Sequence, residues 1–539
     1  MLLALPDELI LAVLFYADTR DRIHCSLVNR RLKRIADNSV MLQLHTECEL
    51  ADVTLRRGSA HITPTDILRA LREYQDAWRT LRWSGEATLS MVTVNEVVVA
   101  GGDRGMFAQL LDTNEIRITL VPSRVRNLPE CTWTLSNIPF LVGVFDIDAA
   151  QRLLIAVEIS ETGGDDGFAL RLHSLDLYSG CAHTSASTPI TFSVLRDYPR
   201  RLTIQIADDR VGIMAAFSGD GLPDDTGRFW VCSWKTGESV MAVRCESFGT
   251  LYGAQSFTFL SRRYILVPRY KWEGAWKDRL CELLVIDTER APQTTTWGNL
   301  VPVVVLDFPA AKVAYCRDIS LNIQASQPSF ASKQDCDSDV LFTHGTHASM
   351  LMLYVSSRYP IFYRLFIPPA SLLEILRTLV PTPLPLSVGI PWTQWSKEAR
   401  LSKASPADET FSYYEHGSYA SFLVHETRRS LNVIAKYDFP TTMQMLRERA
   451  MTSPLLTARQ NSSDVEVLEV QYHLGNELLE ADGIWNGLLS SAPYRKTIIF
   501  VETARPIDPS RHRLQCRITE DAILIRSEVP GSSWRMFYI

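Results

Sequence analysis

Three kinds of segment in this 539-residue chain combine residues that can bind an anion or a metal ion. The glycine cluster at 101–105 follows an apolar run, but no helix is predicted after it to receive a phosphate, so a strand hairpin is favoured. The acidic loops at 163–167 and 220–225 lack the ligand register of a calcium loop. His344 and His347 have no neighbouring cysteine or acidic partner, which favours a turn over a zinc site.

The familiar motifs of catalysis are also missing from the sequence. It contains no G-x-S-x-G nucleophile turn, no H-E-x-x-H zinc motif and no Walker phosphate loop. Its 10 cysteines include no C-x-x-C pair, a pattern typical of reduced, mostly buried thiols in an intracellular protein. We therefore predict a protein that is not an enzyme and that needs no cofactor or metal ion.

Composition narrows the possible environments of the chain. With 46% hydrophobic and 22% charged residues, the sequence predicts two to four globular domains. The net charge of −6 argues against a nucleic-acid partner. Asp7 and Glu8 interrupt the apolar N-terminal run, unlike in a signal peptide, and no apolar stretch reaches the roughly 20 residues of a membrane span. We expect a cytoplasmic or nuclear protein without membrane contact.

The first forty residues predict three short helices. Pro6, Asp7 and Glu8 suit the first turn of a helix with apolar residues on one side, at positions 9, 13 and 14. The turn at 18–21 can cap a second helix. The third helix is expected to have a basic, solvated face at 30–34 and an opposite apolar stripe of Leu27, Val28, Leu32 and Ile35. Such a unit makes a poor independent core, so its surplus apolar surface is expected to meet a partner.

This segment resembles the F-box. The resemblance covers residues 4 to about 42 and rests on Leu5-Pro6-x-Glu8-Leu9, the D-x-R-D turn and the run from Cys25 to Leu32. It departs from the usual pattern at Ala17 and Arg22, where we expect weaker packing. The resemblance implies that eight residues line the contact with the Skp-type adaptor of a cullin–RING ligase: Leu5, Pro6, Leu9, Val13, Leu14, Leu27, Val28 and Leu32. The alternative is a helical cap whose apolar stripe packs on the protein's own body.

A further helix is predicted from Asp66 to Trp83. Its apolar residues recur every three or four positions, and Thr65 or Asp66 can cap it. Trp78 and Trp83 indicate docking onto the next domain, because large aromatic side chains dominate buried contact area. A helix that ends in W-R-T-L-R-W after an F-box is similar to a group of large fungal F-box proteins with a β-rich body. The helix would then act as a semi-rigid spacer.

From about residue 88 the pattern changes to short β-branched runs separated by turn residues. Runs that begin at residues 97, 153, 211 and 264 are 56, 58 and 53 residues apart, and turns at 112, 176, 233 and 287 are 64, 57 and 54 apart. Later runs begin at 340, 422 and 498, at wider intervals of 76, 82 and 76. Tandem units of this length suit the four-stranded blades of a β-propeller. We predict an irregular propeller of about seven blades.

The predicted organisation has three parts. An all-α F-box at 1–45 and a helical linker at 46–87 precede an all-β domain at 88–539, which carries a helical and proline-rich insertion near 369–395. The leading functional prediction is a substrate-recognition adaptor of a Skp/cullin/F-box-type ubiquitin ligase, whose β domain binds an unidentified target protein. The alternatives are a propeller scaffold outside any ligase and, least favoured, a propeller-fold hydrolase.

Overall fold

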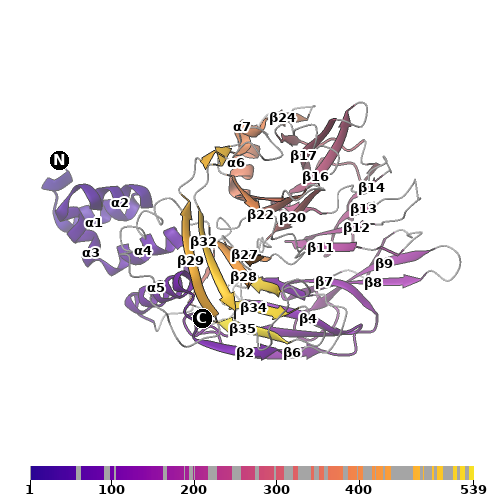
Figure 1. Cartoon of the computed structure of the whole chain (residues 1–539), viewed down its shortest axis with the longest axis horizontal. Helices are drawn as coiled ribbons and strands as arrows, with labels where there is room; N and C mark the ends of the chain where they lie inside the picture. The colour runs from indigo at the N-terminus through magenta and orange to yellow at the C-terminus, as the bar shows by residue number, and fades with distance from the viewer. Residues whose placement is uncertain are drawn as a thin grey trace.

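The computed structural model describes residues 2–51, 53–55, 62–89, 98–101, 105–161, 167–186, 189–192, 198–199, 201–216, 227–245, 256–273, 278–296, 299–308, 320–325, 341–344, 351–356, 362–379, 387–396, 399–404, 416–418, 421–428, 431–438, 465–473, 477–478, 489–490, 494–501, 514–518, 522–527 and 533–538. Figure 1 shows two parts, a helical unit at the N-terminus and a large β body. The C-terminus lies near helix α5, where the two parts meet. Within the described residues, no helix has the length and apolar character of a membrane span.

The helical unit (residues 2–80) contains η1 (Leu2–Ala4), α1 (Asp7–Tyr16), α2 (Thr19–Val28), α3 (Arg30–Asn38), α4 (Val40–Ala51) and α5 (Pro64–Thr80). Asp18 begins α2, because its side chain accepts a hydrogen bond from the backbone N–H of Asp21 at 2.7 Å. Asn29 begins α3 in the same way, with an extended backbone that ends α2 at Val28. The prediction of one stripe from 27 to 35 on a single helix is therefore wrong, since Asn29 divides it between two helices.

Helix α5 was expected from its apolar spacing, and the structure confirms it with shifted ends. It begins at Pro64 rather than Asp66, because Thr63 is the capping residue and accepts from the N–H of Asp66 at 3.2 Å. It ends at Thr80, and Leu81 then takes a left-handed conformation with φ 55°. The capping prediction for Thr65 or Asp66 is therefore wrong by two or three residues.

Two hydrophobic clusters divide the helical unit, and α4 contributes to both. The first cluster joins α1, α3 and α4 through Ile10, Leu14, Leu32, Ile35 and Leu42. The second joins α4 and α5 to the β body through Leu44, Cys48, Val53, Ile67, Leu68, Leu71, Tyr74, Leu341 and Phe342. Burial raises the pKa of the Cys48 thiol to about 11, so this side chain is neutral at physiological pH. The domain boundary expected at residue 45 lies inside α4.

Seven sheets of four or five strands follow one another in the described part of the chain. Sheet 1 contains β3 (Val98–Gly101), β4 (Met106–Asp112), β5 (Glu115–Leu120) and β6 (Cys131–Leu135). Sheet 2 contains β7 (Val142–Asp148), β8 (Leu153–Glu161), β9 (Phe168–Asp176) and β10 (Ile190–Thr191). Sheet 3 contains β11 (Arg201–Ala207), β12 (Arg210–Ala216), β13 (Gly227–Ser233), β14 (Ser239–Cys245) and β18 (Thr294–Thr296).

The remaining four sheets repeat this plan. Sheet 4 contains β15 (Thr258–Phe259), β16 (Tyr264–Glu273), β17 (Asp278–Asp287), β19 (Val304–Asp307) and β24 (Val388–Ile390). Sheet 5 contains β20 (Ser320–Ala325), β22 (Leu351–Ser356), β23 (Phe362–Ile367) and β25 (Arg400–Ala404). Sheet 6 contains β26 (His416–Ser418), β27 (Ser421–Arg428), β28 (Leu431–Asp438), β32 (Tyr494–Val501) and β29 (Val465–His473). Sheet 7 contains β33 (Leu514–Ile518), β34 (Ala522–Ser527), β35 (Trp534–Tyr538) and β2 (Gly85–Leu89).

The first strands of the sheets touch one another in a closed series. Contacts run from β3 to β7, β11, β15, β20, β26 and β33, and from β33 back to β3. Sheet 7 completes the circle in a second way, because its outermost strand β2 comes from the start of the body and pairs with β35 at its end. A circle of antiparallel sheets with the first strand of each at the centre is a propeller-like arrangement.

In the part of the chain that the structure describes, apolar side chains fill the spaces between successive sheets from 1 to 5 and between sheets 7 and 1. On β8, Leu153, Ile155 and Val157 face sheet 3, whereas Leu154 and Ala156 face sheet 1. Alternation along a strand sends successive side chains to opposite faces, and here both faces are covered, so nearly every position is apolar. This is why the sequence reads as short continuous apolar runs.

Short elements connect one sheet with the next. Strands β18 and β24 pair in parallel with β14 and β19, the outer strands of the preceding sheets. Helices α6 (Pro369–Leu379) and α7 (Trp392–Trp395) lie between β23 and β25 and pack into the core shared by sheets 4 and 5. The helix predicted near 369 is confirmed, and residues 380–386 of the proline-rich segment lie outside the described residues. Two more pairs are β1 (Val53–Leu55) with β21 (Phe342–His344), and β30 (Glu477–Leu478) with β31 (Leu489–Ser490).

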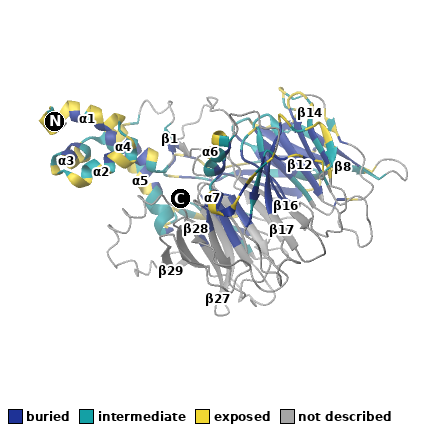
Figure 2. Ribbon diagram, turned by 90° about the horizontal axis from the view of Figure 1, so that it is seen from above, coloured by how far each residue is buried: buried dark blue, intermediate teal, exposed yellow. Residues whose placement is uncertain are grey.

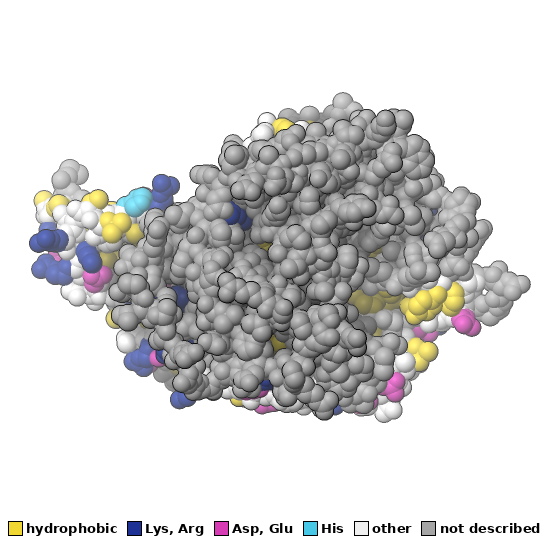
Figure 3. Space-filling model, in the orientation of Figure 1, with side chains coloured by type: hydrophobic (Ala, Val, Ile, Leu, Met, Phe, Trp, Pro, Cys, Tyr) yellow, Lys and Arg dark blue, Asp and Glu magenta, His cyan; other side chains and the backbone are white. Residues whose placement is uncertain are grey.

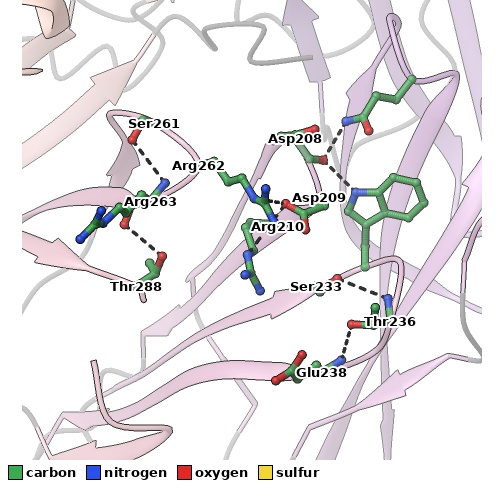
Figure 4. A network of polar contacts seen from close by, with 12 residues as sticks. Asp208, Asp209, Arg210, Ser233, Thr236, Glu238, Ser261, Arg262, Arg263 and Thr288 are labelled. Atoms are coloured by element: carbon green, nitrogen blue, oxygen red, sulfur yellow. Dashed lines mark hydrogen bonds and ion pairs between the residues drawn. The ribbon is translucent and has the colours of Figure 1, made fainter. Parts of the chain in front are cut away.

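Polar side chains connect sheets 2, 3 and 4 at the turns between their first and second strands (Figure 4). The backbone oxygen of Asp208 accepts hydrogen bonds from Gln151 at 2.7 Å and Trp234 at 2.9 Å. Arg262 of the next sheet reaches Asp209 at 2.6 Å. Within sheet 4, Arg263 binds the fully buried carboxylate of Asp287, also at 2.6 Å. The turns therefore fix the rotation of adjacent sheets.

Replacement of Arg263 by methionine should destabilise the β body by about 3 kcal/mol, because the buried Asp287 carboxylate would lose its bidentate partner. The matched control is Arg262→Met, whose ion pair with Asp209 is on the surface and should contribute less than about 1 kcal/mol. Chemical denaturation of both variants measures the difference. Equal midpoints for the two variants would show that Asp287 does not depend on Arg263.

Candidate protein-binding surface

Exposed apolar side chains are concentrated on the helical unit. Of the 12 large hydrophobic residues that are exposed in the described part of the chain, eight lie between residues 3 and 41: Leu3, Leu9, Val13, Phe15, Tyr16, Leu27, Val28 and Met41. Figure 3 shows apolar side chains on the surface of this unit, next to basic ones, and Figure 2 shows the exposed positions along its helices. An exposed apolar surface on so small a unit indicates a protein-binding site.

Helix α1 has apolar residues on two faces, and only one of them is covered. Ile10 and Leu14 point into the first cluster and are almost completely buried. Leu9, Val13 and Tyr16 follow at i, i+4 and i+7 on another face, and the Tyr16 side chain is 90% exposed. The covered face holds the helix in the unit, and the uncovered face is available to a partner.

The end of α2 supplies the other part of the surface. Leu27 is 74% exposed and Val28 is 80% exposed, although both are aliphatic. Asn29 ends the helix directly after them and turns the chain into α3. Five exposed apolar residues of α1 and α2 are together called the apolar surface below: Leu9, Val13, Tyr16, Leu27 and Val28.

The structure divides the eight residues that the resemblance selected. Leu9, Val13, Leu27 and Val28 are exposed on the apolar surface, Pro6 is exposed just before α1, and Leu5 is half-buried against the first cluster. Leu14 and Leu32 are buried in the first cluster and stabilise the unit from within. Sequence reasoning missed Tyr16, although it continues the spacing of Leu9 and Val13. It also missed Leu3, Phe15 and Met41.

A basic side chain of α3 holds the N-terminal segment against the unit. The Arg31 guanidinium donates to the Asp7 carboxylate, with Nε at 2.9 Å, and to the backbone oxygen of Leu5 at 2.8 Å. Arg34 lies 4.0 Å from the same carboxylate. The face at 30–34 was predicted to be only solvated, which is wrong for Arg31. This side chain fixes the start of α1, where the apolar surface begins.

The position of Arg22 also differs from expectation. Its side chain lies between α2 and α4, where it is only 4% exposed and pairs with Glu49. Thr19 bonds to both Arg22 and Glu49. The departure from the usual F-box pattern therefore introduces an ion pair between the buried Arg22 guanidinium and the exposed Glu49 carboxylate, which ties α2 to α4 in place of an apolar contact.

Where the structure describes them, the segments considered above as anion or metal sites form parts of strands and hairpins. Gly101 and Met106 pair across the β3–β4 hairpin, and Gly105 has φ 63°, so the hairpin prediction is confirmed although residues 102–104 lie outside the description. His344 pairs with Val53 in β1–β21, and His347 lies outside the described residues, as do 163–166 and 220–225. No group of three or more potential metal ligands occurs in the described ranges.

Comparison with known proteins identifies the helical unit. Residues 2–45 match a family model described as F-box-like. The chain therefore carries an F-box-like domain at its N-terminus, followed by a propeller-like β region. No curated protein matches the chain.

Solved structures similar to the chain include two WD40 domains. That of Toxoplasma gondii coronin is 8% identical, with 78% of this chain and 86% of the other covered at a TM-score of 0.32. That of SCAP from fission yeast is also 8% identical, with 85% and 98% covered at a TM-score of 0.36. Since both TM-scores are below 0.5, the description of the β body rests on its own sheet order.

The division between core and surface can be tested by stability. Leu14→Ala should lower the free energy of unfolding of the helical unit by about 2–4 kcal/mol, because it leaves a cavity in the first cluster. Leu9→Ala, the matched control on the opposite face, should change it by less than about 0.5 kcal/mol. Hydrogen exchange of the amides of α1 in the full chain measures both. A similar loss of protection in the two variants would mean that Leu9 also belongs to the core.

Proposed function

We propose that this chain is a substrate-recognition adaptor of a Skp/cullin/F-box-type ubiquitin ligase. The F-box-like domain at residues 2–45 suggests this role. The observation that carries the proposal is the uncovered apolar surface on α1 and α2, which a Skp-type adaptor would cover. The chain itself contributes no catalytic residue in this proposal; ubiquitin transfer is performed by partner proteins and accelerated by proximity. Such a role places it in the cytoplasm, the nucleus or both.

The proposed contact with the Skp-type adaptor differs from the set implied by resemblance alone. It consists of Leu9, Val13, Tyr16, Leu27 and Val28, with Pro6 and the exposed part of Leu5 at its edge. Leu14 and Leu32 support this surface from beneath. Burial of a side chain of this size contributes about 1–3 kcal/mol, so five of them suffice for a stable complex.

The β body, in this proposal, is a closed seven-bladed propeller that holds the target protein. The closed series of first strands and the pairing of β2 with β35 support seven blades. The helical unit and the segment directly after it touch the body at Phe342, Lys436 and Phe537. Phe342 lies in a connection between a first and a second strand, and Lys436 and Phe537 lie near the ends of third strands, so all three are at the same end of the strands of the β body. The opposite end is therefore the surface proposed for the target.

A scaffold outside any ligase is the second candidate, and one observation favours it. Helices α4 and α5 pack on the β body through the second cluster, as a helical cap would. This packing accounts for α4 and α5 but leaves the apolar surface of α1 and α2 uncovered. The adaptor proposal explains both.

Binding of the Skp-type adaptor should depend on the apolar surface. The double variant Leu9→Ala/Val28→Ala removes apolar area from two helices and should weaken the complex at least about tenfold, since each 1.4 kcal/mol is a factor of ten. Calorimetric titration of the purified full chain measures the affinity. Leu141→Ala, which changes an exposed leucine of the β body, is the control and should bind like the unchanged protein. Equal affinity of the double variant and the control would exclude this surface.

Target capture should survive the loss of adaptor binding. In the variant Leu9→Asp/Val28→Asp both changed side chains are on the surface, so the cores and the β body stay intact. The variant should capture the target without ubiquitination, and the target should accumulate in cells. Crosslinking with the ligase inhibited identifies the target, and its abundance is then compared between variant and unchanged chain. If both chains lower target abundance equally, the protein does not act through an F-box-linked ligase.

A further inference from the structure

A buried cation of the β body completes one end of helix α5. Lys436, at the end of β28, is 1% exposed, and its Nζ donates to the backbone oxygen of Trp78 at 3.2 Å. Trp78 lies in the last turn of α5, where carbonyl groups lack partners within the helix and the helix dipole is negative. The same ammonium lies 5.0 Å from the centre of the Trp78 ring. A buried charge is favourable only while such partners stay in place, so a small shift of α5 would be costly.

A second attachment comes from an insertion in sheet 5. Strand β21 lies between β20 and β22 and pairs with β1, the segment between α4 and α5. Its Phe342 ring is fully buried and meets Tyr74 of α5 edge to face, with ring centres 5.4 Å apart. The Arg126 guanidinium of sheet 1 lies 6.0 Å from the centre of the same Phe342 ring.

A third attachment follows α5 directly. Trp83 contacts both Trp78 and Phe537 of β35, with ring centres 5.9 and 6.2 Å apart. The next residue, Ser84, donates its backbone N–H to Tyr538 at 2.8 Å before β2 pairs with β35. Sheets 5, 6 and 7 thus each hold α5 at a different point. Three separate attachments together prevent the helix from rotating freely relative to the β body.

The orientation of α5 is passed to the apolar surface through α4. Leu44 and Cys48 of α4 belong to the cluster shared with α5, and Leu42 of the same helix belongs to the cluster shared with α1 and α3. Arg72 of α5 also reaches the buried Glu47 of α4 at 3.3 Å. A continuous packed path therefore leads from the β body to α1.

We propose that Lys436 and Phe342 are positioning residues, which hold the helical unit in one orientation and thereby fix the direction from the target to the bound ligase. The inference rests on the proposed function for its biological meaning. Its physical content is independent of it, because the contacts are made within this chain alone. A fixed direction limits which lysines of a bound target can be reached, since a ubiquitin-loaded partner arrives from one side only.

The test measures the distance between the two parts in the isolated full chain. Spin labels on unnatural residues, introduced in place of the exposed Arg30 of α3 and the exposed Glu238 of sheet 3, avoid the 10 native cysteines. The unchanged chain should give one narrow distance distribution. Lys436→Met/Phe342→Leu, which removes the ammonium group and the aromatic ring but leaves an apolar side chain at each site, should broaden it or add a second population. The variant Lys436→Arg/Phe342→Leu, which keeps the positive charge at position 436, should restore part of the narrow distribution.

The control is Lys235→Met, because the exposed Lys235 also stacks on a tryptophan, 5.1 Å from the centre of the Trp234 ring, but far from the helical unit. It should leave the distribution narrow. Affinity for the Skp-type adaptor should be the same in all these variants. A narrow distribution in the folded double variant overturns the inference, and so does a parallel loss of adaptor affinity, which would mean that these residues build the surface instead of orienting it. If the unchanged chain binds no adaptor, the proposed function fails while the distances still test the attachment.

Discussion

The pairing of β2 with β35 is the contact on which the rest of the structure depends. A sheet whose two faces are both apolar is stable only between two neighbours, and the first and last sheets of an open row would each leave one face in water. Strand β2, which belongs to the start of the body, is the outer strand of sheet 7, and Phe107 of sheet 1 meets Trp534 of sheet 7 in the cluster between them. Closure therefore buries the two faces that tandem repetition alone would leave exposed.

The same closure explains how a small helical unit can be held so firmly. Helix α5 ends four residues before β2 begins, so the strand that closes the circle also fixes the end of the helix. The helical unit packs on the β body through the second cluster. It is held by contacts with several sheets, and its other face remains free. Separation of a fixed side from a free side is what an adaptor between two partners requires.

The sequence predicted well where strands occur, but it predicted less well which strand of one sheet corresponds to which strand of the next. The runs at 153, 211 and 264 lie at the second strands β8, β12 and β16, but residue 97 precedes the first strand of sheet 1, residue 340 precedes the inserted β21, and residue 498 lies in the fourth strand β32. The turn at 112 ends a second strand, whereas those at 176, 233 and 287 end third strands. Strands β7, β8 and β13 are the first, second and third strands of their sheets, yet all three are mostly buried in the part that the structure describes, so apolar content cannot tell these positions from one another. Errors of this kind shift the boundary of a predicted unit without removing the unit.

The candidate surface was predicted in the same partial way. Residues 5–16 are apolar around most of the circumference of α1, so periodicity could not decide that Leu14 turns inward and Val13 outward. That choice depends on where α3 and α4 lie, and on Asn29, which ends α2 in the middle of an apolar run. Trp78 and Trp83 predicted that α5 docks onto the β body, but the sequence did not predict which residues of the body it contacts. Lys436 and Phe342 come from distant parts of the chain, and no local pattern marks either of them.

Strands β18 and β24 have a consequence for the behaviour of the protein at high concentration. The outer strand of a sheet presents unpaired N–H and C=O groups to which a strand of another molecule can add. In sheets 3 and 4 the outer strands β14 and β19 are covered by short parallel segments of the same chain, each three residues long. A three-residue edge offers few hydrogen bonds to an incoming strand. These two sheets are thereby protected against edge-to-edge aggregation by covering segments that belong to the units that follow them.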